Sequence, residues 1–419
     1  MSAGASAIAA AKAGPSTRSA PIQKSFVPCD LLIAILPGVT GPPVGAAATP
    51  QLRVMSVSEV PQSTSDVHPD AECHLSRYTT LRLGGWATRV VTATSADDIV
   101  RGVREAGDRG EQILVLAGGS NVVIGDAGFP GTVVLVRSRG LKVIETDTDT
   151  VTVRVEAGEP WDELVAHTVA NEWSGLECLS GIPGSTGATP IQNVGAYGQE
   201  VAETITGVQV YDRVTGTTAR IEARDCGFSY RSSIFKRSDR WVVLSVDFRL
   251  ARSPLSGPVR YAELARALDV AVGDRVPLAK ARAAVLRLRA GKGMVLDAAD
   301  PDTWSVGSFF TNPVLDRAGY ERLRERAADV GEPPSWPGTD GTVKVSAAWL
   351  IDKSGFGKGH PGPAGVVTIS TKHTLALTHR SGTARTEDLV RLAREIRRGV
   401  QARFGVTLHP EPVLVNCAL

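Results

Sequence analysis

Two glycine-rich loops are the parts of this sequence whose composition suits the binding of a charged ligand. The first loop is Ala117-Gly118-Gly119-Ser120-Asn121, and the second covers residues 181–190, where Ser and Thr stand between the glycines. Glycine lets the backbone approach a ligand closely and turn its N–H groups inward, and hydroxyl groups add donors, so both loops favour a diphosphate. Each loop is equally consistent with a cluster of structural turns, and at this point that alternative stays open.

Neither loop matches the two common nucleotide-binding patterns. G-x-G-x-x-G marks a dinucleotide-binding Rossmann domain, and G-x-x-x-x-G-K-[ST] marks the phosphate loop of ATPases. The mismatch disfavours both classes. The first loop does follow a short apolar strand predicted at residues 113–116, which is where a phosphate-binding loop is expected.

The histidines and cysteines lack the spacing of a metal site. There is no H-E-x-x-H, and His373 and His379 lie six residues apart on one predicted strand and its exit. The five cysteines form no C-x-x-C pair; they are Cys29, Cys73, Cys178, Cys226 and Cys417. A chain this long needs no disulfide staples, so we expect reduced thiols and no metal.

Composition and charge are those of an ordinary globular protein. The 419 residues are 42% hydrophobic and 21% charged, and 46 basic against 44 acidic residues leave a formal charge of +2. This balance excludes the one-signed field of nucleic-acid binders. The arginines between Arg391 and Arg398 share a predicted helix with apolar residues at core spacing, so a solvated polar face is favoured over a binding patch.

The N-terminal segment differs in composition from the rest of the chain. Residues 1 to 55 are rich in Ala, Ser, Pro and Gly and carry one apolar run at residues 31–36. That run is far shorter than the roughly 20 residues that span a bilayer, and the pattern of a signal peptide is weak. We expect a disordered tail over residues 1–70, in part an extension upstream of a natural start near Met55.

Periodicity and turn residues predict an α+β layout. Residues 79–91 indicate strand and turn. Helices are predicted at 95–107, where Ser95 and Asp98 form a capping box, and at 161–171 after Pro160, 277–289, 316–328 and 386–404. Strands are predicted at 113–116, 132–136, 150–156, 208–213, 241–250 and 374–378. A strand-rich first lobe followed by a mixed second lobe favours α+β over a doubly wound sheet.

A series of motifs in a fixed order resembles the UDP-N-acetylenolpyruvoylglucosamine reductase family. The resemblance covers about residues 75 to 416 and rests on residues 117–121, Gly128-Phe129-Pro130-Gly131, Gly175-Leu176-Glu177, Ile182-Pro183-Gly184, residues 191–198, Tyr230-Arg231-Ser232-Ser233-Ile234-Phe235-Lys236, Gly307-Ser308-Phe309-Phe310-Thr311-Asn312-Pro313, residues 348–352 and Leu408-His409-Pro410-Glu411. It implies non-covalent FAD in a two-part lobe of the vanillyl-alcohol oxidase type, followed by a smaller α/β substrate-binding domain.

The resemblance also implies a reaction and a site. An enolpyruvyl group on a uridine-diphosphate amino sugar would be reduced by FAD that NADPH recharges. Such a reaction needs a hydride carrier, a clamp for a developing enolate and a proton source. By motif, Ser308 is the proton donor, Arg231 clamps the enolate, and Glu411 orients or protonates the intermediate.

The same comparison assigns the ligand contacts. FAD is expected to contact Ala117, Gly118, Gly119, Ser120, Asn121, Gly181, Ile182, Pro183, Gly184, Ser185, Gly187, Ala188, Gln192, Asn193, Gly195, Ala196 and Tyr197. The substrate is expected to contact Tyr261, which matches the tyrosine of a capping loop found in one subclass, and Lys292 and Asn312 at its diphosphate and sugar. Lys353 is a further candidate cation at a position where the family varies.

Plainer interpretations exist for each residue. Ser308 fits a helix cap or a turn, Arg231 fits a pair with Asp225 or Asp247, and Glu411 before Pro412 fits a surface acid. Tyr261 fits a half-buried aromatic anchor, and Lys292 fits a solvated cation at a helix end. The occurrence of the first three residues inside their motifs favours the site.

Two other functions stay open from the sequence. An FAD oxidase or lactone dehydrogenase could share the flavin lobe, and a UDP-sugar sensor could keep the fold without turnover. We expect a cytoplasmic monomer with a UDP-sugar and NADPH as ligands and no nucleic-acid or membrane partner. The expected divisions are a tail (1–70), an FAD lobe (71–255), a substrate-binding domain with a linker helix (256–410) and a C-terminal segment returning to the FAD lobe (411–419).

Overall fold

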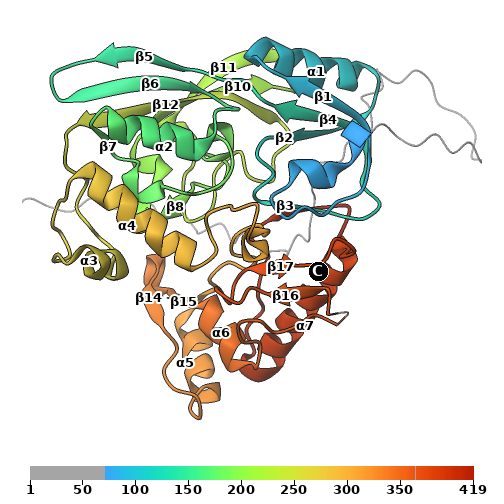
Figure 1. The fold of residues 1–419 in the computed structure, drawn as a ribbon, viewed down its shortest axis with the longest axis vertical. Coiled ribbons are helices and arrows are strands. Elements are labelled where there is room, and N and C mark those ends of the chain that lie inside the picture. The colour runs from blue at the N-terminus through green and yellow to red at the C-terminus, as the bar shows by residue number, and fades with distance from the viewer. Residues whose placement is uncertain (1–70, 364) are drawn as a thin grey trace, which may run out of the picture. The chain divides into compact units, whose positions relative to one another are not determined.

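The structure is a computed structural model that describes residues 71–363 and 365–419 (Figure 1). The predictions for the tail at residues 1–70, including the apolar run, Cys29 and Met55, lie outside the described residues. Cys73, Cys178, Cys226 and Cys417 are free thiols. In the described part of the chain, no helix has both the length and the apolar character needed to cross a membrane.

A small parallel sheet follows two 3₁₀ turns at Ala71–Cys73 and Leu75–Tyr78. Its strand order is β1-β4-β2, with bounds β1 (Ala87–Ala93), β4 (Phe129–Val136) and β2 (Gln112–Leu116). Helix α1 (Ala96–Asp108) packs Ile99 and Val103 into the same core as Val134 of β4. The predicted cap is present, since the Ser95 hydroxyl accepts a hydrogen bond from the Asp98 N–H at 3.1 Å.

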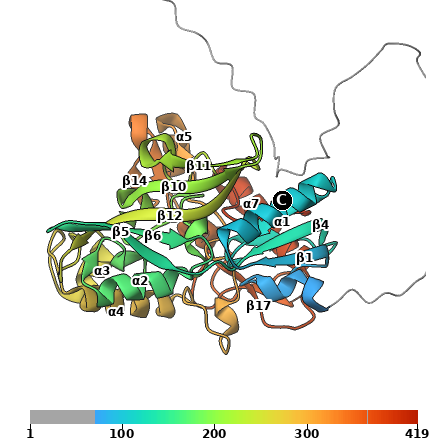
Figure 2. The same cartoon turned by 90° about the horizontal axis from the view of Figure 1, so that it is seen from above.

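A larger antiparallel sheet follows. Its order is β11-β10-β12-β6-β5, with β7 (Trp173–Ser174) paired to the end of β12, and Figure 2 shows it from above. The strands are β5 (Leu141–Thr146), β6 (Thr150–Glu156), β10 (Ile205–Asp212), β11 (Thr217–Glu222) and β12 (Trp241–Arg252). Helix α2 (Trp161–Ala170) lies under this sheet in Figure 1, where Trp161 and Phe248 pack with ring centroids 5.9 Å apart. This contact closes the main core of the first lobe.

The last third of the chain is more helical, as predicted. It contains the helices α3 (Ala262–Leu268), α4 (Leu278–Gly291), α5 (Arg317–Arg326), α6 (Ala347–Lys353) and α7 (Thr386–Phe404). Two small antiparallel sheets join them, one with the order β13 (Val314–Leu315), β15 (Val343–Val345), β14 (Ser335–Pro337), the other made of β16 (Val367–Ile369) and β17 (Leu377–His379). The α+β class is therefore confirmed.

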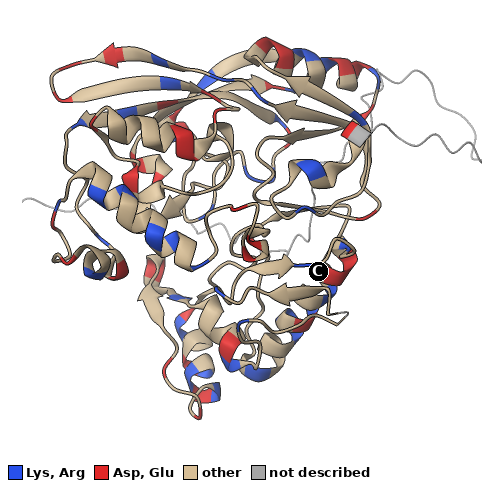
Figure 3. Ribbon diagram, viewed as in Figure 1, with Lys and Arg blue, Asp and Glu red and all other residues tan. Residues whose placement is uncertain are grey.

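Helix α7 has the apolar and polar faces that its sequence pattern predicts. Leu389, Leu392 and Ile396 are fully buried in the second core, whereas Arg391 and Arg394 pair with Glu387 on the outer face. Figure 3 shows charges of both signs along this helix. The predicted polar face is thus a face of ion pairs beside a buried apolar stripe.

Two strands far apart in the sequence form one short parallel ladder. Strand β18 (Val413–Val415) pairs with β3 (Val122–Ile124) directly after the first glycine loop. A second small hairpin is formed by β8 (Gly195–Ala196) and β9 (Gln199–Glu200). Both pairings involve the motifs. Strand β3 follows Asn121 and β18 begins two residues after Glu411, and β8 belongs to the motif at residues 191–198.

Some element boundaries were wrong. The strand expected within residues 79–91 starts only at Ala87, because Arg82 and Gly84 adopt positive φ angles of 56° and 130° and hold the preceding residues in a turn. The strand expected at 374–378 is Leu377–His379, because the Ser370 hydroxyl accepts from Lys372 N and His373 N and forms a turn there. His373 therefore lies outside the strand. Pro160 is the N-cap of α2 rather than its first helical residue.

His373 links this turn to the loop at residues 307–309. Its Nδ1 accepts a hydrogen bond from Leu375 N at 3.0 Å, and the Leu375 carbonyl accepts one from Phe309 N at 2.8 Å. Burial, aided by the charges of Lys292, Lys358 and Arg289, lowers the pKa of His373 from 6.5 to about 4. The folded protein therefore holds a neutral imidazole that can accept.

This environment predicts an acid-dependent loss of stability. As the pH falls below 6.5, His373 is protonated in the unfolded chain but stays neutral in the folded chain until the pH reaches about 4. The free energy of unfolding therefore decreases as the pH drops from 6.5 to about 4. The variant His373→Asn keeps an acceptor but does not titrate. Urea unfolding at several pH values should show the wild-type advantage over this variant shrinking by up to about 3 kcal/mol from pH 7 to pH 4. A difference that stays constant with pH would contradict the assignment.

Candidate active site

The Ser308 and Glu411 motifs run side by side. The Phe309 carbonyl accepts a hydrogen bond from Glu411 N at 2.9 Å, and the His409 carbonyl accepts one from Thr311 N at 3.1 Å. Phe309 is fully buried between these contacts. Two motifs far apart in the sequence are therefore fixed to each other by main-chain bonds, which do not depend on side-chain choice.

Arg231 completes the group of three predicted catalytic residues. Its Nε lies 3.3 Å from Glu411 Oε1, and its Nη2 donates to the Gly195 carbonyl at 2.9 Å. The alternative partners are engaged elsewhere, since Asp247 pairs with Arg154 and Arg220, and Asp225 pairs with Arg224. The plainer interpretation of Arg231 is therefore wrong.

The backbone of Arg231 is itself unusual. Its φ angle is +52°, in a region that non-glycine residues seldom occupy. The main chain is stabilised there by Lys236, whose Nζ donates to the Arg231 carbonyl at 2.8 Å. Such strained residues occur preferentially where a side chain has to be aimed. Here the conformation aims the guanidinium at Glu411.

Glu411 is an acid in a largely enclosed place. Its side chain is 16% exposed, so the surface-acid interpretation is wrong. Burial raises the pKa of the Glu411 carboxyl, and Arg231 and Lys236 oppose that rise without cancelling it. Burial also lowers the pKa of Lys236. A carboxyl held this way keeps its proton to higher pH than an exposed glutamate.

Ser308 stands in an irregular loop whose backbone is hydrogen-bonded on both sides of it. On one side, the Ser305 hydroxyl accepts from Gly307 N at 3.2 Å; on the other, Phe309 N donates to Leu375. Ser308 precedes no helix, so it is not a helix cap, and its side chain is partly exposed. Its hydroxyl is therefore held by a fixed backbone beside the segment that carries Glu411.

The two glycine loops form one surface. A Cβ added at Gly118 would lie only 2.5 Å from Gly184 Cα, and the Ser120 hydroxyl donates to the Pro183 carbonyl at 2.9 Å. Gly184 has a φ of +119°, a conformation that favours glycine. Glycine is thus required where the loops touch, and their backbone groups remain close together.

Side chains connect this surface to the three predicted catalytic residues. Asn121 Nδ2 donates to Gln192 Oε1 at 3.1 Å, and Gln192 Nε2 donates to Glu411 Oε1 at 3.4 Å. The Asn121 carbonyl accepts from Val413 N at 3.0 Å. Asn121 and Gln192 therefore join the first glycine loop to Glu411 and Arg231.

Several predicted cofactor residues have structural partners. The amide of Asn193 bonds to Glu200, Ser229 and Ala202, and the residue is 1% exposed. Gly187 lies against Ala157, where a Cβ would come within 2.5 Å. Asn193 and Gly187 therefore make internal contacts that support the second glycine loop. Ile182, Ser185, Ala188, Gly195 and Ala196 lie along the same stretch of chain. A Cβ added at Gly181 would lie 2.8 Å from the Leu286 side chain and 3.1 Å from that of Val295.

A second cluster gathers predicted substrate residues with one predicted cofactor residue. The rings of Tyr197 and Tyr261 meet edge to face with centroids 5.6 Å apart, and the Lys292 ammonium lies 5.8 Å from the Tyr197 centroid. Lys292 also pairs with Glu263 at 2.7 Å, and Tyr261 is 42% exposed. Burial raises the pKa of Tyr197 to about 12, so its phenol stays a neutral donor. The structure thus groups Tyr197 with Tyr261 and Lys292.

Asn312 and Lys353 are placed at opposite ends of α6. Asn312 Oδ1 accepts from Ala347 N at 2.9 Å, which satisfies the start of the helix. Lys353 is the last residue of the helix, and its Nζ lies 3.8 Å from Asp352. Asn312 follows the Ser308 segment directly, whereas Lys353 is not brought to the Tyr261 cluster by any described contact.

Sequence reasoning missed Arg289, whose positive charge opposes the rise in the pKa of the Tyr197 phenol. Burial lowers the pKa of Arg289, its Nη2 donates to the Met294 carbonyl at 2.8 Å, and within residues 71–363 and 365–419 its buried Nε has no hydrogen-bond partner. Its position three residues before Lys292 at the end of α4 was the available signal.

Within residues 71–363 and 365–419, no group of His, Cys, Asp and Glu could hold a metal ion.

Two protein-family models match this chain. The model described as "FAD binding domain" covers residues 87–222, and the model described as "UDP-N-acetylenolpyruvoylglucosamine reductase, C-terminal domain" covers residues 300–415. The first contains both glycine loops, and the second contains Ser308 and Glu411. The predicted FAD-binding lobe is thus confirmed, and FAD is the cofactor.

Named relatives match most of the chain. A UDP-N-acetylenolpyruvoylglucosamine reductase of Salinispora arenicola is 99% identical over 363 residues, which are 87% of this chain and 100% of that protein. One of Saccharopolyspora erythraea is 56% identical over 355 residues, covering 84% of this chain and 97% of that protein.

A solved structure agrees on the fold. The crystal structure of UDP-N-acetylenolpyruvylglucosamine reductase from Thermus caldophilus matches with a TM-score of 0.52 and 23% identity, covering 81% of this chain and 97% of that one. Together with the near-identical relative and the two family models, this shows that the chain belongs to the UDP-N-acetylenolpyruvoylglucosamine reductase family.

Proposed function

We propose that this protein uses NADPH and FAD to reduce enolpyruvyl-UDP-N-acetylglucosamine to UDP-N-acetylmuramate, a step in making peptidoglycan precursor. The observation that carries the proposal is the convergence of Ser308, Arg231 and Glu411 beside two touching glycine loops. Family membership supports the same reaction. The proposal includes a cytoplasmic, monomeric enzyme of the subclass with a capping tyrosine.

The residues around the glycine loops fit FAD. The close approach of Gly118 to Gly184 brings the main-chain N–H groups of both loops and the Asn121 amide into one place, and these donors suit a diphosphate. The Ser120 hydroxyl holds the loops together through its bond to the Pro183 carbonyl. When bound, FAD supplies hydride to the terminal carbon of the enol ether. Residues 117–121, 181–188 and Gln192 are the proposed contacts.

Arg231 would stabilise the negative charge that develops on the substrate carboxylate. Its guanidinium is permanently charged and planar, and the bond to the Gly195 carbonyl fixes its orientation before substrate binds. Because its partner Glu411 has a raised pKa, the substrate carboxylate can replace a weakly held neighbour. Preorganised charge of this kind lowers the barrier without reorganisation during the reaction.

Ser308 would deliver the proton to the carbon that bears the ether oxygen. A serine hydroxyl is a weak acid, but a carbanion beside a carboxylate is a strong base, so placement matters more than acidity. The backbone bonds on both sides of Ser308 supply that placement. Glu411 would orient or protonate the intermediate from the adjoining segment.

The Tyr197, Tyr261 and Lys292 cluster would hold the uridine diphosphate. It offers a cation and two phenols, one of them exposed enough to move over a ligand. Asn312 would contact the sugar, although its Oδ1 is engaged with α6 and only its N–H₂ is available. We propose that Tyr261, Lys292 and Asn312 belong to a substrate-binding domain with a linker helix at 256–410, whereas Tyr197 reaches the cluster from an FAD lobe at 71–255. A segment at 411–419 returns to that lobe.

The proposed reaction can be tested by separating its two halves. The purified protein should be yellow or become yellow with FAD, and NADPH should bleach it under anaerobic conditions. Adding the enolpyruvyl sugar should then restore the flavin absorbance faster than oxygen does. A colourless protein that takes up no FAD, or reoxidation by oxygen alone, would reject the proposal and favour a sensor or an oxidase respectively.

Ser308→Ala should separate the same two steps. Because Ser308 supplies only the proton, flavin reduction by NADPH should stay within about twofold of the wild type, whereas reoxidation by the enolpyruvyl sugar should fall by at least about a thousandfold. Stopped-flow absorbance measures both. Equal loss of the two half-reactions would contradict the assigned role.

Lys292→Gln tests the diphosphate contact, and Lys353→Gln provides a matched control. The first change should raise KM for the UDP-sugar by about tenfold or more while leaving the FAD content unchanged, since a charge-assisted phosphate contact is lost. The second should leave KM within about twofold, because Lys353 is the last residue of α6 and no described contact joins it to the Tyr261 cluster. Steady-state kinetics decides. An equal effect of both changes would show that net charge, not position, matters.

A further inference from the structure

The segment at residues 78–83 lies between the first glycine loop and the Ser308 loop. Thr80 N donates to the Gly119 carbonyl at 3.1 Å, and the Thr80 hydroxyl donates to the Ser305 carbonyl at 2.7 Å. The same hydroxyl lies farther, 3.4 Å, from the Gly119 carbonyl. Thr80 therefore bonds the first glycine loop through its backbone. Through its side chain it bonds the loop at residues 300–309, which contains Ser308 and is called the proton-donor loop below.

The main chain of residues 78–80 packs directly against the main chain of the first glycine loop. Gly119 has a φ of +61°, and a Cβ at that position would lie 1.9 Å from the Tyr78 carbonyl oxygen. Main chain therefore touches main chain here, and Thr80 is 8% exposed. The position of the Thr80 hydroxyl relative to the glycine loop is fixed by backbone geometry rather than by side-chain flexibility.

The contact with the proton-donor loop passes directly toward Ser308. Ser305 accepts from Thr80 with its carbonyl, and its own hydroxyl accepts from Gly307 N at 3.2 Å. Ser305 is 5% exposed, so both bonds are shielded from water, where hydrogen bonds are hardest to replace. Gly307 is the residue immediately before Ser308.

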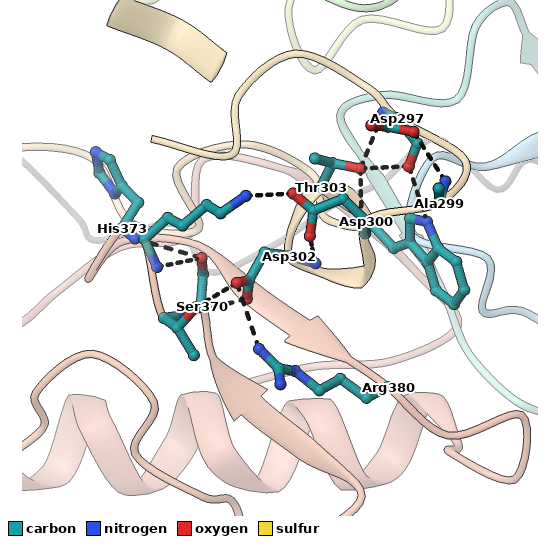
Figure 4. A network of polar contacts seen from close by, with 11 residues as sticks. Asp297, Ala299, Asp300, Asp302, Thr303, Ser370, His373 and Arg380 are labelled. Carbon is teal, nitrogen blue, oxygen red and sulfur yellow. Dashed lines mark hydrogen bonds and ion pairs between the residues drawn. The ribbon is translucent and has the colours of Figure 1, made fainter. Parts of the chain in front are cut away.

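The rest of that loop is anchored to a different part of the molecule. Figure 4 shows Asp302 bonded to Arg380, and Asp302 also accepts from Thr371 N at 3.0 Å. Lys372 pairs with Asp300 in the same network. These contacts tie the loop to the β16–β17 hairpin. After Ser308, the loop is also joined to the first glycine loop through Glu411, whose N donates to the Phe309 carbonyl, and Val413, whose N donates to the Asn121 carbonyl. Before Ser308, the contact with the glycine loop is made by residues 78–83.

We propose that Thr80 is a positioning residue that sets the proton-donor loop at a fixed distance from the glycine loop. The inference rests on the proposed function, in which hydride comes from the cofactor held by the glycine loop and the proton comes from Ser308. The two additions occur at adjacent carbons of one substrate, so their sources must keep one spacing. The assigned role of Thr80 is exerted through Ser305 and Gly307.

Thr80→Val tests the role, and Thr79→Val is the matched control. Both threonines are buried and both donate one hydroxyl hydrogen bond to a backbone carbonyl, but Thr79 bonds Leu83 within its own turn at 3.0 Å. Thr80→Val removes the hydroxyl bond to Ser305 and the longer hydroxyl contact with the Gly119 carbonyl, and it keeps the backbone bond from Thr80 N to Gly119. Any general effect of an extra buried methyl group should appear equally in the control.

We expect a selective kinetic defect in Thr80→Val. FAD content and flavin reduction by NADPH should stay within about twofold of the wild type, and reoxidation by the enolpyruvyl sugar should slow by about ten- to a hundredfold, with a larger solvent deuterium isotope effect because proton delivery is misplaced. Thr79→Val should match the wild type in both half-reactions. Thr80→Ser, which keeps the hydroxyl, should recover to within about threefold.

Other outcomes would overturn the proposal. They are equal losses in both half-reactions, an equal defect in Thr79→Val, or no recovery in Thr80→Ser. If Thr80→Val does not fold, Ser305→Ala removes the next bond in the same path and must show the same selective defect; normal reoxidation in that variant overturns the proposal.

A readout without substrate separates this inference from the proposed function. Amide hydrogen exchange at Gly307 and Phe309 should accelerate in Thr80→Val but not in Thr79→Val. Unchanged exchange at both amides overturns the Thr80 role. Failure of the wild-type flavin to be reoxidised by the enolpyruvyl sugar overturns the proposed function instead, and the exchange result still decides whether Thr80 holds the loop.

Discussion

The main-chain bond between Glu411 N and the Phe309 carbonyl is the constraint on which the site depends. It fixes the segment that ends the chain to the loop that carries Ser308, and β18 then pairs with β3 beside the first glycine loop. Three stretches of sequence are joined by backbone groups alone. Because these groups are buried, leaving one unpaired would cost about 1–3 kcal/mol, which keeps the arrangement intact through side-chain changes.

Burial and charge set the character of the site once this frame exists. Glu411 is enclosed, which raises its pKa, and it faces Arg231 and Lys236, which oppose the rise. Arg231 adopts a backbone conformation that non-glycine residues seldom occupy, and Lys236 stabilises it by donating to the Arg231 carbonyl. The Gly195 carbonyl accepts from the guanidinium and orients the side chain. The site is thus held ready by its surroundings, and its charges need little rearrangement when a ligand arrives.

Two ligand regions follow from where glycine and aromatic residues are placed. Gly118 and Gly184 touch because neither carries a Cβ, so the donors of both loops share one surface. Tyr197 and Tyr261 meet edge to face beside Lys292 and form a separate region with a cation and phenol groups. The Asn121, Gln192 and Glu411 contacts connect the first region to the catalytic group.

The sequence by itself determined the local elements and the family. Ser95 caps α1 and the apolar stripe of α7 is buried as predicted, because caps and 3.6-residue periodicity depend on neighbours along the chain. The motifs containing Ser308, Arg231 and Glu411 could likewise be identified from the sequence, because each is a short run of consecutive residues. Only the tertiary structure decided that Arg231 pairs with Glu411 and not with Asp247, that the Asn193 amide is used internally, and that Tyr197 lies with Tyr261. It also decided that Thr80 joins two loops. These are contacts between residues distant in sequence, and their energies depend on burial and on partners that no local pattern encodes.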